Sequence, residues 1–166
     1  MGRIISFDQA SVVTGYALFE DNQYVESGVI KKSKDVPIAD RVPAMALAIC
    51  KKIKEVQPDV VILEDIQNQN SVKTVVDLAR LQGGIIMYCA NKHIPIHIYH
   101  PSTWRRALGF TQGTKTKRDD LKLQAIEYVK SIGMQIDIED ENEAVCINIA
   151  AQKLLNNTKY LWSNFE

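Results

Sequence analysis

Two short β-rich runs that each end in a carboxylate constrain the fold of this chain most strongly. Residues 4–7 lead to Asp8, and the continuous apolar residues 60–63 lead to Glu64. A continuous apolar run of this length is typical of a strand buried on both faces of a parallel sheet. Ligands of open α/β sheets bind at the carboxyl ends of the strands. The sequence therefore predicts an α/β fold with Asp8 and Glu64 near one such edge.

The remaining pattern predicts a mixed sheet, in which a three-stranded antiparallel meander joins parallel strands and helices flank the whole. A tight turn at Asp21-Asn22 separates the second and third strands. Gly83-Gly84 lies inside a predicted helix, so we expect close packing or a bend there. The expected strands are 3–8, 13–20, 23–31, 60–64 and 95–99, and the expected helices are 37–57, 71–91, 102–108, 118–131 and 141–155. A chain of 166 residues fits one domain over residues 1–166.

Composition limits where the protein works and how its charge is used. No apolar run reaches the roughly 20 residues that span a bilayer, and the start lacks a secretory signal, so we expect a cytoplasmic protein. Cys50, Cys89 and Cys146 lie far apart among apolar neighbours, which predicts buried, reduced thiols. The net charge is zero, but basic residues gather in 105–122 and acids in 137–143. Such runs are usually solvated faces, although two opposite clusters also suit a phosphate site.

Four carboxylates are candidates for one metal site. Asp140 and Glu143 are three residues apart at the start of a helix, so they share a face, and Asp8 and Glu64 end neighbouring strands. Oxygen ligands select hard ions such as Mg²⁺ or Mn²⁺, and a pair of ions roughly 4 Å apart could activate a water for phosphodiester hydrolysis. Each acid could also have a purely structural role. Asp8 could form a hydrogen bond to a turn, Glu64 could be a surface residue, and the acids at 139–143 are favoured at a helix N-terminus by the macrodipole.

Three motifs in order resemble the RuvC-type Holliday junction resolvases. Phe-Asp-Gln-Ala-Ser at 7–11 and Thr-Gly-Tyr at 14–16 are similar to the family's D-P-G-S-x-x-T-G-Y/W strand. Leu63-Glu64 resembles the second acidic motif, and Asp-Glu-Asn-Glu-Ala at 140–144 resembles D-x-x-D/H-A on the last helix. The resemblance covers residues 3–155. The divergent loops and short length are similar to those of a phage-encoded member, with a phage of a lactococcal host as the suggested source.

The resemblance implies an RNase H-like fold and a homodimer that nicks Holliday junctions during phage DNA recombination. Each active site would use two Mg²⁺ ions, with Mn²⁺ as a substitute. The residues that match the four catalytic, metal-binding carboxylates are Asp8, Glu64, Asp140 and Glu143. Arg105 stands where the family has a phosphate-contacting lysine, and Lys117 best matches a second one. The expected DNA-binding residues are Arg105, Lys115, Lys117 and Arg118, which is also reasonable from phosphate electrostatics alone.

The chain departs from the family pattern at three places. Gln9-Ala10 replaces the usual Pro-Gly, and Glu143 stands where Asp or His is usual. Gln67 occupies the position of an aromatic residue that inserts at the junction centre. Phage relatives are similar to resolvases with relaxed selectivity, so we expect cleavage of forks, flaps and other branched DNA with little sequence specificity.

Two rival functions stay open, together with the role of helix 71–91. Actin-like ATPases and sugar kinases share the strand topology and a phosphate loop, of which this chain offers only Thr14-Gly15. A module that binds branched DNA without cutting it is the other rival. Helix 71–91 carries an apolar face that suits either a dimer interface or the core, formed by Val75, Ala79, Ile86 and Met87.

Overall fold

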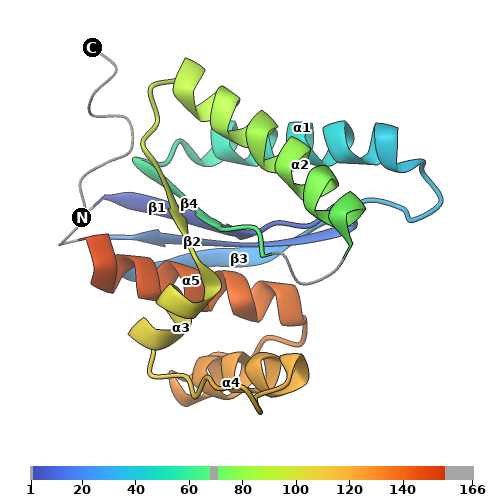
Figure 1. Cartoon of the computed structure of the whole chain (residues 1–166). Coiled ribbons are helices and arrows are strands. Elements are labelled where there is room, and N and C mark those ends of the chain that lie inside the picture. The colour runs from blue at the N-terminus through green and yellow to red at the C-terminus, as the bar shows by residue number, and fades with distance from the viewer. Residues whose placement is uncertain (1, 68–70, 156–166) are drawn as a thin grey trace.

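The computed structural model describes residues 2–67 and 71–155, which form a five-stranded sheet with helices on both faces (Figure 1). The strands are β1 (Arg3–Asp8), β2 (Val13–Glu20), β3 (Gln23–Lys31), β4 (Val60–Glu64) and β5 (Ile96–Tyr99). The helices are α1 (Ile38–Val56), α2 (Val72–Asn91), α3 (Pro101–Ala107), α4 (Arg118–Ser131) and α5 (Glu139–Leu154). The predicted elements are confirmed, although α5 begins at Glu139 rather than at residue 141. The prediction of one domain over 1–166 extends beyond the described residues and stays a prediction.

The strand order is β3-β2-β1-β4-β5, which confirms the predicted mixed sheet. β1, β2 and β3 pair antiparallel, whereas β1–β4 and β4–β5 pair parallel. Asp21 and Asn22 both have positive φ, as a two-residue hairpin turn with the twist of the flanking strands requires. Because β1 and β4 run in the same direction side by side, their carboxyl ends, with Asp8 and Glu64, meet at one edge.

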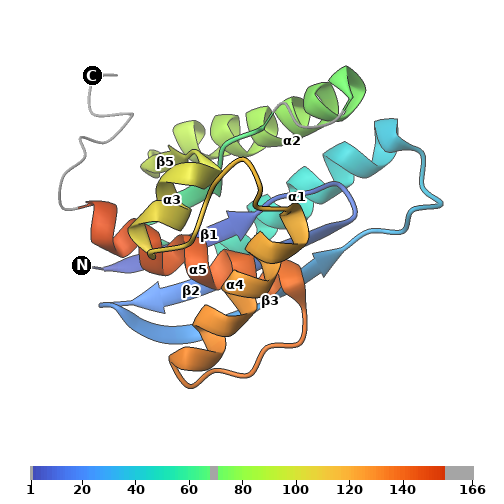
Figure 2. The ribbon, with the colours of Figure 1, turned by 60° about the horizontal axis from the view of Figure 1, so that its bottom comes forward.

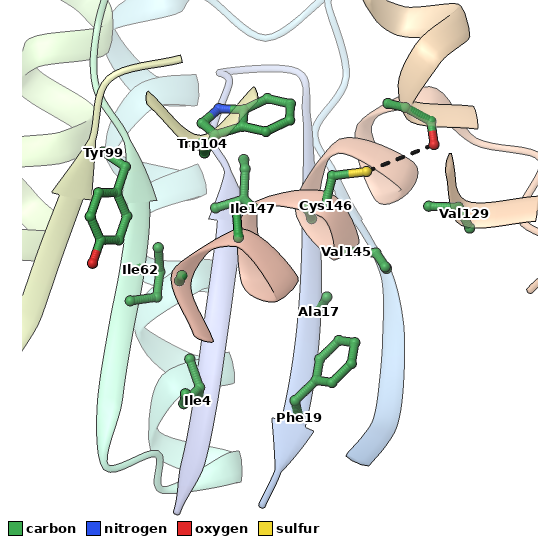
Figure 3. Close-up of a cluster of buried hydrophobic side chains, with 14 of the residues drawn as sticks. Ile4, Ala17, Phe19, Ile62, Tyr99, Trp104, Val129, Val145, Cys146 and Ile147 are labelled. Carbon is green, nitrogen blue, oxygen red and sulfur yellow. Dashed lines mark hydrogen bonds between the residues drawn. The ribbon is translucent and has the colours of Figure 1, made fainter. Parts of the chain in front are cut away.

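Alternating strand residues divide the core into two layers, as the period of a strand dictates. On one face, Ile5, Phe7 and Leu63 pack with α1 and α2. On the other, Ile4 and Ile62 pack with α5, Trp104 and part of α4, as Figure 3 shows. Asn148 of α5 donates its amide to the carbonyls of Ile4 and Ala17, both at 3.0 Å, which fixes this helix on the sheet. The α5 layer therefore rests directly against β1.

Cysteine and glycine predictions were partly right. Cys89 and Cys146 are buried free thiols, whereas Cys50 is only half-buried because it faces a groove between α1 and α2. At Gly84, an added Cβ would lie 3.4 Å from the Ala46 side chain, so close helix packing is confirmed there. No atom lies within 4 Å of the same position at Gly83, so packing does not explain that glycine.

α1 and α2 also expose apolar side chains around this groove, which measures about 910 Å³. The buried residues of α2 are Leu81, Gln82, Ile85 and Cys89. The predicted apolar face therefore lies mostly outside the core: Ala79 and Met87 are exposed, Met87 at 71%, whereas Ile86 is half-buried against the core. Leu47 of α1 is exposed to the same extent as Met87. Within the described residues, no helix has the length and apolarity needed to cross a membrane.

Candidate active site

The four predicted carboxylates line one cleft of about 690 Å³ at the carboxyl edge of β1 and β4. Asp8 ends β1, Glu64 ends β4, and Asp140 and Glu143 lie in the first turns of α5. Arg105 of α3 also lines the cleft. Figure 2 shows α3, α4 and α5 gathered on one side of the sheet. Residues from distant parts of the sequence thus meet where strand topology predicts a ligand site.

Gly15 sets how closely α5 approaches Asp8. Gly15 pairs with Asp8 in the β1–β2 ladder, and an added Cβ would lie 1.9 Å from the Asp140 carbonyl oxygen. Only a residue without a side chain allows this approach. Ser6 also holds α5 against the sheet, because its hydroxyl donates to the carbonyl of Ala144 at 2.7 Å. The small residues Ser6 and Gly15 therefore allow the helix that carries Asp140 and Glu143 to lie close to Asp8.

Glu64 is held by neutral and charged neighbours. The indole Nε1 of fully buried Trp104 donates to Glu64 Oε1 at 2.8 Å, and Arg105 Nη2 lies 3.9 Å from the same oxygen. Burial raises the pKa of Glu64 to about 7, with the Glu143 charge adding to the effect and the Trp104 hydrogen bond and Arg105 opposing it. Near neutral pH, Glu64 is thus poised between its protonated and ionised forms.

The other three carboxylates also bind protons more tightly than usual. Burial raises the pKa of Asp8 well above its ordinary range, and the charges of Glu143, Glu64 and Asp140 raise it further. A hydrogen bond between Asp8 and Glu143 acts in the same direction. Burial is also the main cause of the raised pKa values of Asp140 and Glu143, which nearby cations partly offset. Four acids that repel one another in a partly desolvated cleft are a functional-site signature.

The predicted basic residues divide into two groups. Arg105 lies between two acids, 3.9 Å from Glu64 and 3.6 Å from Glu143, and its side chain is 11% exposed. Arg118 at the start of α4 also lines the cleft. Lys115 and Lys117 lie exposed on the segment before α4 and are not among the residues that line the cleft. The structure therefore brings Arg105 and Arg118 to the acids and leaves the two lysines outside.

Several residues that line the cleft or support Glu64 from behind it were not predicted from the sequence. Trp104 supplies a hydrogen-bond donor to Glu64, and Gln9 and Gln82 both donate to the main-chain carbonyl of Glu64. Arg41 and Lys73 add positive charge to the wall opposite Arg105, on the α1 and α2 side. No sequence period marks these residues, because each acts through a contact between elements far apart in the chain. Only Gln9 could have been suspected from the sequence, because it directly follows the candidate site residue Asp8.

The donor chemistry of the cleft fits a hard divalent cation. Across residues 2–67 and 71–155, no three Asp, Glu, His or Cys side chains already form a metal-holding group. The four acids nevertheless present only carboxylate oxygens to one cleft. Their pKa values are raised first by burial and then by one another's charges, even with Arg105 beside Glu64 and Glu143. Carboxylate oxygens are the ligands that Mg²⁺ and Mn²⁺ prefer. Release of the proton shared by Asp8 and Glu143 would accompany binding.

The strand order and the helices on both faces define an RNase H-like fold. Residues 4–150 match the family described as crossover junction endodeoxyribonuclease RuvC. The chain therefore belongs to the RuvC family.

Individual relatives agree with this assignment. A crossover junction endodeoxyribonuclease RuvC of Caldicellulosiruptor saccharolyticus is 23% identical over 171 residues, covering 99% of both chains. The one of Corynebacterium efficiens is 26% identical over 110 residues, which are 66% of this chain. The match covers 47% of that relative, so this chain spans about half its length. The solved structure of T. thermophilus RuvC in complex with Holliday junction substrate has a TM-score of 0.75 at 12% identity, covering 96% of this chain and 98% of that one.

Proposed function

We propose that this protein is a metal-dependent Holliday junction resolvase that hydrolyses one phosphodiester bond per active site. The observation that carries the proposal is the cleft in which Asp8, Glu64, Asp140 and Glu143 meet from three elements. Membership of the RuvC family gives the reaction class. The same membership sets aside the ATP-binding alternative, whereas a binding module without nuclease activity is separated by the experiment below.

Each cleft residue then has a distinct task. Asp8, Glu64 and Asp140 hold the metal ions, and Glu143 supports them or orients the water. Trp104 keeps one oxygen of Glu64 in place through its indole hydrogen bond. Arg105 offsets the charge of Glu64 and Glu143 and, with Arg118, faces the phosphate of the DNA strand. Lys115 and Lys117 extend this basic surface outside the cleft.

Divalent metal use fits the RuvC family and the all-oxygen donor set, and we propose two Mg²⁺ ions with Mn²⁺ as a substitute. When bound, the ions supply a more acidic water and charge stabilisation at the phosphate. The protein's own part is to hold four carboxylates together at a cost in repulsion, so that the site is arranged before the cation arrives.

We propose a broad range of branched DNA substrates, including forks and flaps. Gln67 lines the cleft at the position of the family's aromatic wedge, and an amide gives weaker base stacking than an aromatic ring. We propose that the protein acts on DNA in the cytoplasm, as fits the RuvC family, and in a bacterial host cell if it is phage-encoded. An origin in a phage of a lactococcal host stays a prediction from the divergent loops.

A homodimer would place two clefts on one four-way junction. The exposed side chains of Leu47 and Met87 border the apolar groove between α1 and α2, where a second copy could pack. Sedimentation at several protein concentrations tests this, with Met87→Lys as the variant that should remain monomeric. A monomeric wild type, or a dimer unaffected by Met87→Lys, would contradict this interface.

Nicking of a labelled four-way junction in Mg²⁺ tests the function. Asp8→Asn should abolish nicking and leave junction binding intact. Glu141→Gln is the matched control: Glu141 lies between Asp140 and Glu143, but its Oε1 accepts from Ser27 Oγ at 2.6 Å, outside the cleft. Nicking by Asp8→Asn, or full activity in EDTA, would refute the proposal. Binding without nicking by the wild type would establish the non-catalytic module.

A further inference from the structure

The main-chain carbonyl of Glu64 is held by two glutamine side chains from different layers of the fold. The backbone pairing of β1 with β4 ends at Phe7 and Leu63, one residue before the two carboxylates. Beyond this point, Gln9 Nε2 and Gln82 Nε2 both donate to the Glu64 carbonyl, the latter at 2.9 Å. The two amides therefore replace the β1 pairing where it stops, while the pairing of β4 with β5 continues to Glu64 and Tyr99.

Both amides are enclosed by the protein, which makes their hydrogen bonds strong and their geometry fixed. Gln9 is 9% exposed and Gln82 is 7% exposed. Gln9 Oε1 is buried and has no hydrogen-bond partner among the residues that the structure describes. A buried amide with an unpaired end destabilises the folded protein, so stability alone would favour an apolar side chain at this position. Donation to Glu64 is the gain that accounts for the amide.

The two glutamines connect the strand ends that carry the acids. Gln9 directly follows Asp8 in the chain, so its bond to Glu64 joins the backbones of both carboxylate residues across the β1–β4 boundary. Gln82 comes from the middle of α2 and secures the same carbonyl from the helical layer. The usual proline of the family at position 9 could not donate a side-chain hydrogen bond. This connection is therefore a property of this chain rather than of the family motif.

We propose that Gln9 and Gln82 are positioning residues that set the orientation of the Glu64 backbone, and through it the metal affinity of the cleft. The proposal rests on the proposed function, since it assigns Glu64 to metal binding. On the β5 side, the ladder continues through Glu64 and Tyr99, and the Asp65 N–H donates to the Tyr99 carbonyl at 2.9 Å. The glutamines act on the other side of this peptide, where they hold the Glu64 carbonyl that no longer pairs with β1.

Two donors on one acceptor predict a non-additive loss. After either glutamine is replaced alone, the other still holds the carbonyl, so we expect at most a threefold effect on Mn²⁺ affinity. Replacing both should weaken Mn²⁺ binding about 10- to 100-fold, the range found when groups supporting a metal ligand are removed. The double variant should thus lose more than the product of the two single losses, as expected for residues that share one partner.

Calorimetric titration of Mn²⁺ into the full-length protein tests this with Gln9→Met, Gln82→Met and the double variant. Methionine keeps the length of glutamine but donates no hydrogen bond. Asn148→Leu is the matched control, because Asn148 is a buried amide that donates to two carbonyls on the α5 side, away from Glu64. Thermal unfolding of each variant without metal reports any purely structural damage.

The expected result is weaker Mn²⁺ binding in the double variant, with kcat for junction nicking reduced at fixed Mn²⁺ and KM unchanged. Asn148→Leu should lower the Tm and leave Mn²⁺ affinity unchanged. Single losses that multiply to the double loss, or an equal affinity loss in Asn148→Leu, would overturn the proposal. If the wild type binds Mn²⁺ but does not nick junctions, the proposed function fails, while the titration still decides the role of the glutamines.

Discussion

Replacing Glu64 by glutamine should make the metal-free protein more stable above pH 7, although it removes a catalytic group. Burial raises the pKa of Glu64 from an ordinary 4.5 to about 7. At about 1.4 kcal/mol for each pH unit, ionising this side chain in the folded state costs about 3 kcal/mol. Glutamine avoids this cost and keeps the carbonyl oxygen that accepts from Trp104 at 2.8 Å.

The sign of the pH dependence follows from linkage. Below pH 4.5, Glu64 is protonated in both the folded and unfolded states, so the variant and the wild type should be equally stable. Between pH 4.5 and about 7, the unfolded chain releases the proton while the folded protein keeps it, so wild-type stability falls as the pH rises. Above pH 7 the full difference is present. The variant should then melt about 5–10 °C higher at pH 8.

Thermal unfolding in EDTA at pH 4.5 and pH 8 measures this difference. Glu141→Gln, whose carboxylate lies outside the cleft, should show no such gain. Mg²⁺ at about 1,000 times its Kd should reverse the order, because it adds about 4.1 kcal/mol to the protein that binds it. A Glu64→Gln protein no more stable than wild type at pH 8, or a gain of equal size at both pH values, would refute the reasoning.

Three further variants probe the surroundings of the acids, and Gly83→Ala serves as a control away from them. Gly15→Ala should lower nicking more than tenfold and the free energy of unfolding by about 1–3 kcal/mol, because the new Cβ meets the Asp140 carbonyl. At Gly83 no described side chain blocks a new Cβ, so Gly83→Ala should instead raise the free energy of unfolding by about 0.5–1 kcal/mol. Trp104→Phe should cost about 1 kcal/mol more at pH 8 than at pH 5 in urea unfolding, since hydrogen bonds to ionised groups are stronger; an equal cost would contradict this. Arg105→Ala should weaken junction binding and reduce its salt slope by about 1 in filter binding; an unchanged slope would place Arg105 outside the phosphate path.

The mixed sheet and the meeting of Asp8 with Glu64 could be predicted, because local patterns indicate the strands and their directions. Alternation, the Asp21-Asn22 turn and the continuous run before Glu64 each report a strand and its direction, and parallel strands bring their carboxyl ends together. The start of α5 was placed two residues late because acids at a helix start resemble a polar loop.

The support of the site could not be predicted, because it depends on pairs far apart in the chain. Trp104 and Glu64 are 40 residues apart, and Gln9 and Glu64 are 55 apart. A buried tryptophan or glutamine looks the same in sequence whether it fills the core or supports a carboxylate. The prediction that Cys50 is buried was wrong for a similar reason. Helical periodicity shows which face of α1 carries Cys50, but not whether a neighbouring element covers that face.

The way in which Glu64 is held explains how the cleft can keep its acids and still bind a cation. A close ion pair would fix Glu64 equally well, but it would lower the pKa and compete with a metal ion for the same oxygens. Arg105 instead lies 3.9 Å from Glu64 and 3.6 Å from Glu143, outside close hydrogen-bond range. The close donors around Glu64 are uncharged: the Trp104 indole donates to the carboxylate, and the two glutamine amides donate to the main-chain carbonyl of the same residue. Neutral donors orient the carboxylate without cancelling its charge, so the charge remains available for the metal.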